Sequence, residues 1–287
     1  MGKYYFLYNP KSGNGTGKET AGKAAALTDG EAVFEDITAI KDYPAFFAKL
    51  QPGDAIVICG GDGTLSRFAD DNYGRLPENK IYHFSSGTGN DFQRDIGAKA
   101  GEELVEVGKY IVNLPTVVIN GAAHRFINGV GYGIDGYCCE EGDRQHEQGV
   151  KNINYTSIAI KGLLFHYKPK DATIIVDGKE YKFKKAWLAP TMNGRYYGGG
   201  MNAAPAQDRL NNSTLSTLVM YGKGKIKTLM VFPSIFKGEH VNHKEMVEVL
   251  TGRKITVRFE SPAALQIDGE TVTGVTEYTA IAPGYEE

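Results

Sequence analysis

Short apolar runs alternate with polar, glycine-rich stretches through the first third of the chain. The apolar runs that predict strands span residues 4–8, 32–37, 55–59 and 80–84, and their length is typical of buried strands. Residues 19–27, 43–50 and 65–70 lie between them and have helical patterns. Repeated strand–helix units predict a doubly wound, Rossmann-like α/β domain, in which helices cover both faces of a parallel sheet.

The pattern changes near residue 114. From there the chain consists mainly of short alternating or β-rich runs, at residues 115–119, 124–130, 172–176, 179–183, 187–191, 214–220, 254–259 and 264–267. Turn signals such as Asn120-Gly121 and Asp177-Gly178 separate several of these runs, and helices are expected only near 154–166 and 225–236. We therefore expect a C-terminal, mainly antiparallel β-sandwich domain.

The sequence GGDGT, from Gly60 to Thr64, directly follows the predicted strand at 55–59. Its three glycines let backbone N–H groups approach an anion, and the helix that follows contributes a partial positive charge at its start. A carboxylate at Asp62 would repel a bound phosphate unless a divalent cation or a substrate hydroxyl lay between them. The pattern therefore indicates phosphoryl transfer. The alternative is an ordinary glycine-rich turn in which Asp62 is a turn or capping residue.

Two other predicted strands also end in polar, glycine-rich turns. Residues 9–18 do not fit the P-loop motif, because Ser12 stands in place of the first glycine and Glu19 follows the lysine. Polar groups in this turn can still bind phosphate, although a flexible solvated loop is the alternative. Parallel strands end at one edge of their sheet. That edge would bring together Asn9, Asp62, Thr88 and Asp91.

Composition narrows the classes of function. The 287 residues include 32 basic and 34 acidic side chains, and no basic block gives an electrostatic case for binding nucleic acid. The cysteines Cys59, Cys138 and Cys139 fit neither a disulfide framework nor a zinc site. The N-terminus lacks the features of a signal peptide, and no apolar run approaches the roughly 18 residues of a membrane span. We therefore expect a cytoplasmic protein whose membrane contact is peripheral, at the inner face.

Seven motifs, taken in order, resemble the diacylglycerol kinase catalytic-domain family, the bacterial lipid kinases related to sphingosine kinases. They are YNPKSGNG, GGDGTL, SSGTGNDFQRDIG, FINGVGYGIDGYC, NGRYYGGGMNAAPAQ, FKGEHVNHKEM and LQIDGE. The resemblance covers nearly the whole chain. It implies a nucleotide-binding domain over residues 1–113, a lipid-substrate domain over 114–275 and a cleft between them. It also implies that the last strand, about residues 276–287, returns to the first domain.

The family uses ATP and Mg²⁺, and the resemblance implies which residues would bind them. The nucleotide contacts would be Asn9, Pro10, Lys11, Ser12, Gly13, Thr38, Gly61, Asp62, Gly63, Thr64, Leu65, Ser66, Arg67 and Thr88. Asp91 matches an acidic residue that helps Asp62 to organise the catalytic Mg²⁺. Arg67 follows Ser66 where the family commonly has Asn-Glu, and its effect on the nucleotide site is left open.

The proton acceptor stays undecided between three carboxylates. The family places it within the final IDGE stretch, whereas related kinases have also been interpreted with the aspartate of GGDGT as the base. Asp62, Asp268 and Glu270 are therefore competing candidates. Without the family context, Asp268-Gly269-Glu270 is typical of a hairpin turn.

One departure from the family pattern concerns a structural metal. After AAPAQ the family usually has an Asp-Gly pair that helps to hold a structural Mg²⁺, but here Asn212 and Ser213 stand at those positions. Because hard divalent cations favour carboxylates, we expect this site at Asn212 to be weak or empty. Asp208 could compensate only if the loop were rearranged.

Residues 153–167 are apolar around most of a helical circumference and are flanked by lysines. They predict either an interfacial element that docks on an anionic leaflet or a core helix covering the sandwich. The favoured function is an ATP-dependent lipid kinase that phosphorylates the hydroxyl of a diacylglycerol-like lipid. The alternatives are a catalytically weak lipid- or nucleotide-binding protein of the same fold and an NAD kinase. The sequence does not identify the lipid, and a homodimer is left open.

Overall fold

The computed structural model describes residues 2–86, 89–150, 153–210 and 213–285. The chain divides into two compact units, Met1–Leu114 and Pro115–Glu287, which we describe one at a time. In the parts of the chain that the structure describes, no helix has both the length and the apolar character needed to cross a bilayer.

A five-stranded sheet in the order β2-β1-β3-β4-β5 forms the centre of the first unit. Its strands are β1 (Lys3–Tyr8), β2 (Glu31–Asp36), β3 (Ala55–Gly60), β4 (Lys80–Ser85) and β5 (Val105–Glu106). The first four run parallel, and β5 pairs antiparallel with β4. All six residues of β3 are buried, as expected of a central strand covered on both faces.

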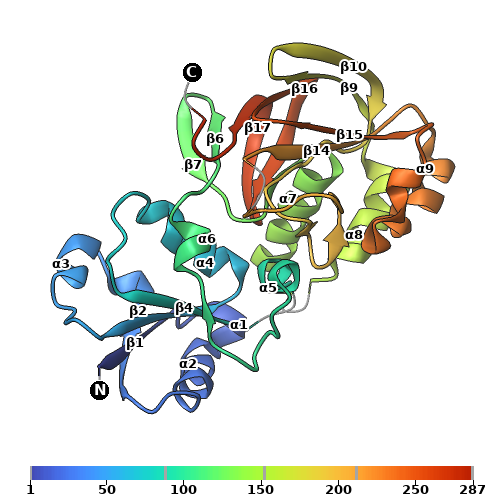
Figure 1. Ribbon diagram of the computed structural model, residues 1–287. Helices are drawn as coiled ribbons and strands as arrows, with labels where there is room; N and C mark the ends of the chain where they lie inside the picture. The colour runs from blue at the N-terminus through green and yellow to red at the C-terminus, as the bar shows by residue number, and fades with distance from the viewer. Residues whose placement is uncertain (1, 87–88, 151–152, 211–212, 286–287) are drawn as a thin grey trace. The chain divides into compact units, whose positions relative to one another are not determined.

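Helices cover both faces of this sheet (Figure 1). They are α1 (Ser12–Gly15), α2 (Gly17–Ala25), the 3-10 turn η1 (Ile37–Ala39), α3 (Tyr43–Phe47), α4 (Asp62–Asp71), α5 (Asp91–Ile96) and α6 (Gly108–Ile111). On one face, Ala21 and Ala24 of α2 pack with Phe6 and Val57 of the sheet. On the other face lie α4 and α6. The doubly wound α/β domain predicted from the sequence is confirmed.

The second unit is built around a ten-stranded sheet, in the order β15-β14-β11-β8-β16-β17-β6-β7, to which the β9–β10 hairpin joins through β16. The strands are β6 (Thr116–Ile119), β7 (Ala122–Arg125), β8 (Gly129–Tyr132), β9 (Lys170–Val176), β10 (Lys179–Ala186), β11 (Thr191–Met192), β14 (Leu215–Met220), β15 (Val247–Gly252), β16 (Lys254–Ile267) and β17 (Glu270–Ile281). A separate pair consists of β12 (Tyr196–Tyr197) and β13 (Met201–Asn202). Every strand pair in the described part of this unit is antiparallel.

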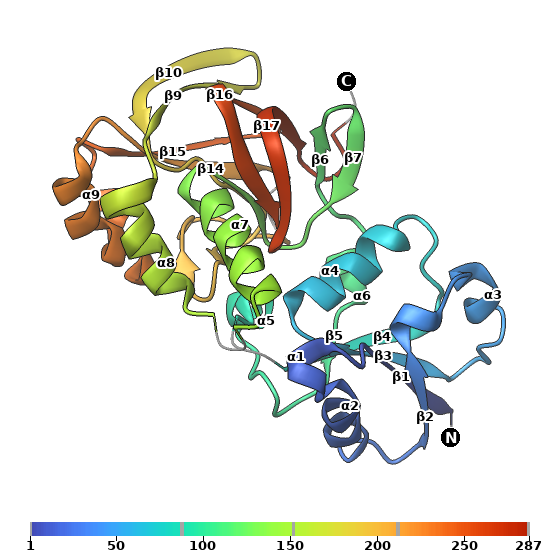
Figure 2. The ribbon, with the colours of Figure 1, turned by 180° about the vertical axis from the view of Figure 1, so that it is seen from behind.

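Helices of the second unit pack against the sheet and against one another (Figure 2). They are α7 (Ile134–Glu147), α8 (Tyr155–Lys161), the π-helical turn η2 (Gly162–His166), α9 (Lys225–Val231) and the 3-10 helices η3 (Phe232–Lys237) and η4 (Glu239–Asn242). The sheet core contains Tyr132 stacked on Phe259, with ring centroids 4.1 Å apart. A second cluster, including Trp187, Leu163 and Ile235, lies under the helices. The expected mainly antiparallel domain is therefore present.

Several sequence-based element predictions need correction. The run at 124–130 is split between β7 and β8, because the backbone N–H groups of residues 127–129 bind a side chain instead of a neighbouring strand. Within the run 187–191, Thr191 belongs to β11, whereas Leu188 forms only isolated bridges. The runs at 254–259 and 264–267 form one long strand, β16, with irregular pairing between Arg258 and Leu265.

The last strand also differs from expectation. Residues 276–281 belong to β17, which pairs with β16 and β6 inside the second unit. The expectation that this strand returns to the first domain is therefore wrong. The hairpin turns at Asn120-Gly121 and Asp177-Gly178 are confirmed, since all four residues have positive φ between paired strands, as a type I′ turn requires.

Candidate functional site

The turns after β1, β3 and β4 lie at one edge of the first unit's sheet. The strand register pairs Tyr8 with Cys59, and Gly60 with Ser85, so the three strands end side by side. In the order β2-β1-β3-β4, the chain adds β2 on one side of β1 and adds β3 and β4 on the other side. The boundary between β1 and β3 is therefore a topological switch point. Open α/β sheets bind ligands at such a switch point, outside the carboxyl ends of the strands. The glycine-rich turns that follow β1 and β3 therefore occupy the position expected of a ligand site.

The GGDGT turn passes directly from β3 into α4. A Cβ atom on Gly60 would lie 2.5 Å from the hydroxyl oxygen of Thr64, so the turn has no room for a larger residue there. The first bond within the helix runs from the Thr64 N–H to the Gly61 carbonyl, at 3.0 Å. The N–H groups of Asp62 and Gly63 thus precede the regular helical bonding, where the start of a ten-residue helix favours an anion.

Asp62 joins this turn to the turn that follows β4. Its Oδ2 accepts hydrogen bonds from the backbone N–H groups of Asp91, at 2.7 Å, and Phe92, at 3.2 Å. Asp62 therefore begins α4 and at the same time caps α5. Asp91 is itself buried, with 4% of its surface exposed. The edge thus brings together Asp62 and Asp91, as the sequence predicts, while Thr88 lies outside the described residues.

No cluster of three or more His, Cys, Asp or Glu side chains suited to a metal ion is present among the described residues. Asp62 and Asp91 are neighbours at the sheet edge, because the backbone N–H of Asp91 donates to Asp62 Oδ2 at 2.7 Å. Two carboxylates satisfy the preference of Mg²⁺, which usually binds proteins through one or two carboxylates and fills its remaining positions with water and phosphate oxygens. The residues present therefore fit a nucleotide-associated Mg²⁺.

His83, on β4, supports the GGDGT turn and was missed by the sequence analysis. Its Nε2 lies 3.0 Å from the carbonyl oxygen of Gly60, and the side chain is completely buried. Burial lowers the pKa of His83 to about 4, so the ring is neutral at pH 7 and Nε2 donates its proton to that carbonyl. A single histidine inside an apolar strand carries no sequence signal for this role.

Several polar groups of the turn after β1 form hydrogen bonds within the turn. Asn9 Oδ1 accepts the Lys11 N–H at 2.9 Å, and the Asn9 carbonyl accepts both the N–H and the hydroxyl of Ser12. A Cβ on Gly17 would lie 2.0 Å from the Asn9 carbonyl oxygen, so α2 packs closely on this turn. Lys11 and Gly13 are exposed. The structure therefore shows a turn at the sheet edge that is held by its own hydrogen bonds.

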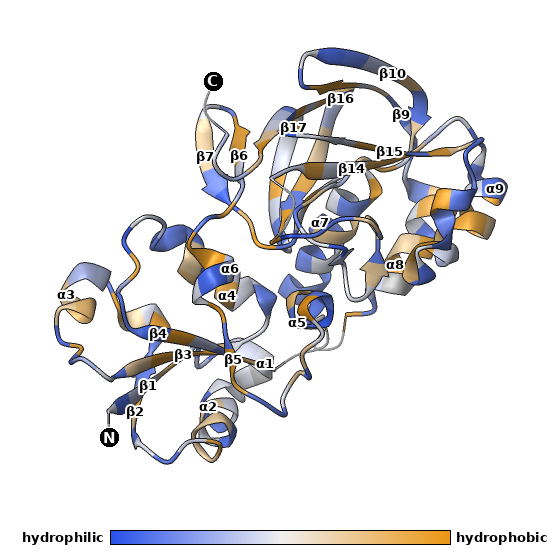
Figure 3. Cartoon of the chain, viewed as in Figure 1, coloured by the Kyte–Doolittle hydropathy of each residue, from blue (hydrophilic) through white to orange (hydrophobic). Residues whose placement is uncertain are grey.

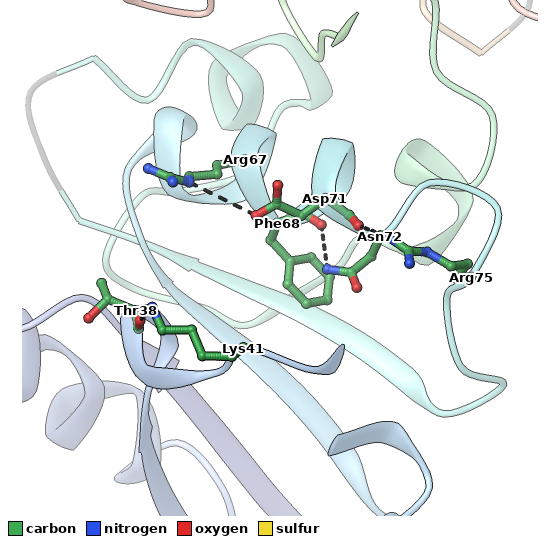
Figure 4. Close-up of polar contacts among 7 residues, drawn as sticks. All are labelled: Thr38, Lys41, Arg67, Phe68, Asp71, Asn72 and Arg75. Carbon is green, nitrogen blue, oxygen red and sulfur yellow. Dashed lines mark hydrogen bonds and ion pairs between the residues drawn. The ribbon is translucent and has the colours of Figure 1, made fainter. Parts of the chain in front are cut away.

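Thr38 and Arg67 are shown in Figure 4, and both have protein partners. The hydroxyl and N–H groups of Thr38 donate to Asp36 at 2.7 and 2.8 Å, and its carbonyl accepts a bond from Lys41. The Nε atom of Arg67 lies 3.9 Å from an Asp71 carboxylate oxygen, one turn further along α4.

The remaining residues predicted to contact the nucleotide differ in their exposure to solvent. Leu65 and Ser66 are buried within α4. Pro10 lies in the turn after β1 and is exposed, and Thr64 is half-buried.

In the second unit, Asp268 lies in the turn between β16 and β17. Both Asp268 and Gly269 have positive φ, at 46° and 99°, so the stretch is a two-residue hairpin turn, as its sequence alone indicates. The Asp268 carboxylate accepts N–H bonds from Ile127 at 2.5 Å, and from Asn128 and Gly129 at 2.9 Å each. Asp268 therefore fixes the start of β8. Glu270, the first residue of β17, is exposed.

Two further side chains hold the same segment. Asn193 Nδ2 donates to the Ile127 carbonyl at 2.8 Å. Arg209 donates to that carbonyl and to Asn128 Oδ1, at 3.1 Å each. The motifs FING, NGR and DGE, which are far apart in sequence, therefore meet in one polar network. Arg209 comes from the loop that departs from the family's metal pattern, and Asn212 itself lies outside the described residues.

A buried carboxyl group, Asp135, was also missed. It lies in the first turn of α7, and burial raises its pKa to about 7, an effect that an interaction with the Tyr197 hydroxyl only partly offsets. A Cβ on the next residue, Gly136, would lie 1.9 Å from the Ala264 carbonyl oxygen, so glycine allows α7 to pack directly on β16. Tyr197 belongs to the YYGGG motif, which supplies a buried ring.

A cavity of about 600 Å³ opens elsewhere in the second unit. It lies between the AAPAQ loop and strands β14 and β15, and its lining includes Pro205, Gln207, Ser216, Lys244, Glu248 and Thr251. Ser216 donates to Gln207 Oε1 at 2.7 Å and lies 3.0 Å from the Thr251 hydroxyl. None of the catalytic or nucleotide-binding residues predicted from the sequence lines this cavity.

Comparison with known families assigns both parts of the chain. Residues 3–120 match the diacylglycerol kinase catalytic domain. Residues 128–285, more than half of the chain, match the YegS C-terminal NAD kinase beta sandwich-like domain. The chain therefore belongs to the diacylglycerol kinase catalytic-domain family, in the form that carries a YegS C-terminal domain. As a member it is a kinase, a phosphotransferase with an alcohol acceptor, and the family supports lipid kinase activity in general.

Individual relatives agree with this assignment. A protein named diacylglycerol kinase from Mycobacterium tuberculosis (strain ATCC 25618 / H37Rv) is 28% identical over 282 residues, covering 91% of this chain and 86% of its own. Two solved structures from Bacillus anthracis str. Sterne are similar in fold. One has a TM-score of 0.68 at 21% identity, covering 97% and 91% of the two chains. The other, of a diacylglycerol kinase, has a TM-score of 0.60 at 20% identity, covering 98% and 94%.

Proposed function

We propose that the chain transfers the γ-phosphoryl group of ATP to the hydroxyl of a diacylglycerol-like lipid. The observation that carries this proposal is the position of Asp62. It begins α4 at the switch point of a parallel sheet, and its carboxylate is held by the N–H groups of Asp91 and Phe92. Phosphoryl transfer needs positioned phosphates and neutralised charge more than covalent participation by the protein. A carboxylate fixed beside a phosphate-binding helix start meets that need.

Each part of the sheet edge has a role in this proposal. The N–H groups at the start of α4 bind phosphate oxygens, and Gly61 and Gly63 let the backbone approach them. Asp62 and Asp91 would hold Mg²⁺, which when bound neutralises the charge of the phosphates. His83 keeps the turn in place through the Gly60 carbonyl, and its neutral ring adds no charge beneath the site.

For the acceptor hydroxyl, the two carboxylates of the β16–β17 turn have different roles. Asp268 already accepts three backbone N–H bonds, which leaves it fewer lone pairs for a substrate hydroxyl. Glu270 is exposed at the start of β17. We propose Glu270 as the proton acceptor and Asp268 as a positioning residue that holds residues 127–129.

The Asp62→Asn variant tests the nucleotide half of the proposal. Loss of the charged ligand should lower kcat for γ-phosphoryl transfer to dioleoylglycerol in mixed micelles at least about a hundredfold. The matched control is Asp29→Asn, an exposed aspartate that precedes β2 and therefore lies at the opposite edge of the sheet. Because Asp62 also caps α5, circular dichroism must show that the variant is folded. A folded variant with unchanged kcat would remove Asp62 from the mechanism.

The pair Glu270→Gln and Asp268→Asn tests the acceptor half. Glu270→Gln should lower kcat at least about a hundredfold with little change in thermal stability, because it removes the proton acceptor at an exposed position. Asp268→Asn should lower both kcat and thermal stability, because it weakens three backbone bonds. Unchanged kcat in folded Glu270→Gln would remove Glu270 from the mechanism. A wild-type chain that binds lipid but transfers no phosphate would support the catalytically weak alternative, and NAD⁺ as acceptor tests the NAD kinase alternative.

A further inference from the structure

Residues 127–129, the short stretch that leads into β8, have a protein partner for every backbone polar group. Their three N–H groups donate to the carboxylate of Asp268. The Asn128 carbonyl accepts the Asn193 N–H at 2.9 Å, and the Gly129 carbonyl accepts the Asp268 N–H at 3.1 Å. The remaining carbonyl accepts bonds from two side chains. The conformation of this stretch is therefore set by directional hydrogen bonds on both sides of the backbone.

Arg209 is the cationic partner of this stretch. Its Nη1 donates to the Ile127 carbonyl and its Nη2 to Asn128 Oδ1, at 3.1 Å each. Asn128 is buried, with 4% of its surface exposed. Hydrogen bonds to a charged group are roughly twice as strong as bonds between neutral groups. The stretch therefore has an anion, Asp268, bonded to its N–H groups and a cation, Arg209, bonded to its oxygen atoms.

These polar bonds lie next to the apolar core of the sheet. Figure 3 shows hydrophobic residues recurring along β14 and β15, two strands of the same sheet. Val130 and Tyr132, which follow the stretch in β8, are buried in the sheet core. Polar groups beside such a core are costly unless they are hydrogen-bonded. Loss of either charged partner should therefore disturb residues 127–129 more than loss of a solvent-exposed bond would.

The loop that carries Arg209 is closed by a buried glutamine. Gln207 Nε2 donates to the Thr214 carbonyl at 2.7 Å, and its Oε1 accepts the Ser216 hydroxyl, also at 2.7 Å. Gln207 thereby joins the residue before the loop to the residues after it. This closure uses neutral side chains and backbone groups of the chain itself, and it holds the backbone from which Arg209 extends.

The same loop is where the family pattern holds a structural Mg²⁺, and its described residues do not fit that ion. Asp208 is the only acidic residue in the sequence from 206 to 216, and its Oδ1 accepts the Leu210 N–H at 3.0 Å. The next residue, Arg209, brings a permanent positive charge, which repels a divalent cation. Mg²⁺ is bound in proteins chiefly through carboxylates, whereas this loop offers one engaged carboxylate beside a guanidinium group.

We propose that Arg209 is the fixed cation of this loop in place of a metal ion, and a positioning residue for phosphoryl transfer. The role rests on the proposed function, because Arg209 acts through Glu270, the proton acceptor proposed above. Arg209 holds the oxygen side of residues 127–129, whose N–H side binds Asp268. Only Gly269 separates Asp268 from Glu270. A shift of the stretch therefore moves Asp268 and misplaces the Glu270 carboxylate, and small misplacements of a reacting group slow catalysis strongly.

Hydrogen exchange measures this positioning without ATP or lipid. The N–H groups of residues 127–129 should exchange equally slowly in Mg²⁺ and in EDTA, because a guanidinium group rather than a metal supports the loop. In Arg209→Ala they should exchange at least about tenfold faster. The control is Arg258→Ala, which removes an exposed arginine of β16 that pairs with Glu277, and it should leave these rates unchanged. Faster exchange in EDTA would show that a metal supports the loop, and would overturn the proposal.

Kinetics separate a positioning role from a purely structural one. Arg209→Lys keeps the charge but lacks the planar fork that reaches two oxygen atoms. It should lower kcat for lipid phosphorylation roughly tenfold and leave KM for ATP within about twofold of the wild-type value. Methylguanidinium, at a concentration that does not unfold the chain, should restore part of the kcat lost in Arg209→Ala and should have no effect on Arg258→Ala. Unchanged kcat in Arg209→Lys would contradict the proposal.

A double-mutant cycle tests whether Arg209 and Asp268 act on the same stretch. Asp268→Asn and Arg209→Lys should each lower kcat, and the loss in the double variant should be at least about fivefold smaller than the product of the single losses. Independent effects would refute the shared role. A wild-type chain that phosphorylates no lipid would overturn the proposed function, and the exchange rates of residues 127–129 would still confirm or refute the support by Arg209.

Discussion

His83 shows how a single buried side chain can hold the GGDGT turn in place. Its neutral ring donates to the carbonyl of Gly60, at the end of the strand that leads into Asp62. In an unfolded chain the same histidine titrates near pH 6.5. The difference between the two states makes the stability of the first unit depend on pH.

The direction of that dependence can be predicted. The pKa of His83 falls to about 4 on folding, so below pH 6.5 the unfolded chain binds a proton that the folded chain does not. The contribution is complete above pH 6.5 and is lost as the pH falls toward 4, by roughly 3 kcal/mol in total. His83→Gln should flatten this part of the profile, as measured by urea unfolding at several pH values.

The control for His83→Gln is His146→Gln, which alters an exposed histidine at the end of α7. That variant should follow the wild-type profile. Equal pH slopes for the wild type and His83→Gln would show that His83 does not set the pH dependence.

At the residue scale, the sequence predicted those features that depend only on the conformational preferences of neighbouring residues. Asp268-Gly269 is a hairpin turn because both residues tolerate positive φ, and that preference is visible in the sequence. What the Asp268 carboxylate binds is not visible, since its partners at 127–129 are about 140 positions away. Asp62 shows the same division: its place at a helix start was predicted, but its bonds to Asp91 and Phe92 depend on the neighbouring strand.

At the scale of elements, α7 is the clearest omission from the sequence analysis. Its sequence, IDGYCCEEGDRQHE, contains two glycines and lacks an apolar stripe, and only Ile134, Asp135, Gly136 and Gly142 among its residues are buried. A helix of this kind is stabilised by close packing rather than by propensity or pattern. Its contact with β16 depends on Gly136.

The packing of α7 predicts that replacing glycine by alanine changes the stability of the chain in opposite directions at two positions. Gly136→Ala places a methyl group 1.9 Å from the Ala264 carbonyl oxygen, so α7 must move, and we expect a loss of about 3 kcal/mol of stability. Gly22→Ala, inside α2 where nothing lies within 4 Å, should raise stability by up to about 1 kcal/mol. Denaturant titration measures both, and a neutral Gly136→Ala would contradict the close packing of α7 on β16.

At the scale of the whole molecule, the order of elements carried most of the information. Strand–helix alternation predicted the parallel first unit, and short strands with Asn-Gly and Asp-Gly turns predicted the antiparallel second unit. The residues of the last strand do not reveal which strands it pairs with. Strand pairing depends on partners that can be distant in sequence, and β17 pairs with β6 and β16. The family motifs suggested a return to the first domain, and the register of β17 overturns this.

The two units carry different parts of the proposed activity. The first provides a helix start and a fixed carboxylate at a sheet edge, and the second provides the Asp268 network and Glu270. Neither unit alone contains every group that phosphoryl transfer to a lipid needs. The full chain is therefore the unit to assay.

The most direct test of the account is transfer of radiolabelled γ-phosphate from ATP by the full chain, with Mg²⁺ and dioleoylglycerol in mixed micelles. The account predicts a labelled lipid phosphate that forms with the wild type and is at least about a hundredfold slower with Asp62→Asn. Absence of labelled lipid with the folded wild type, or equal labelling by the two proteins, would contradict it.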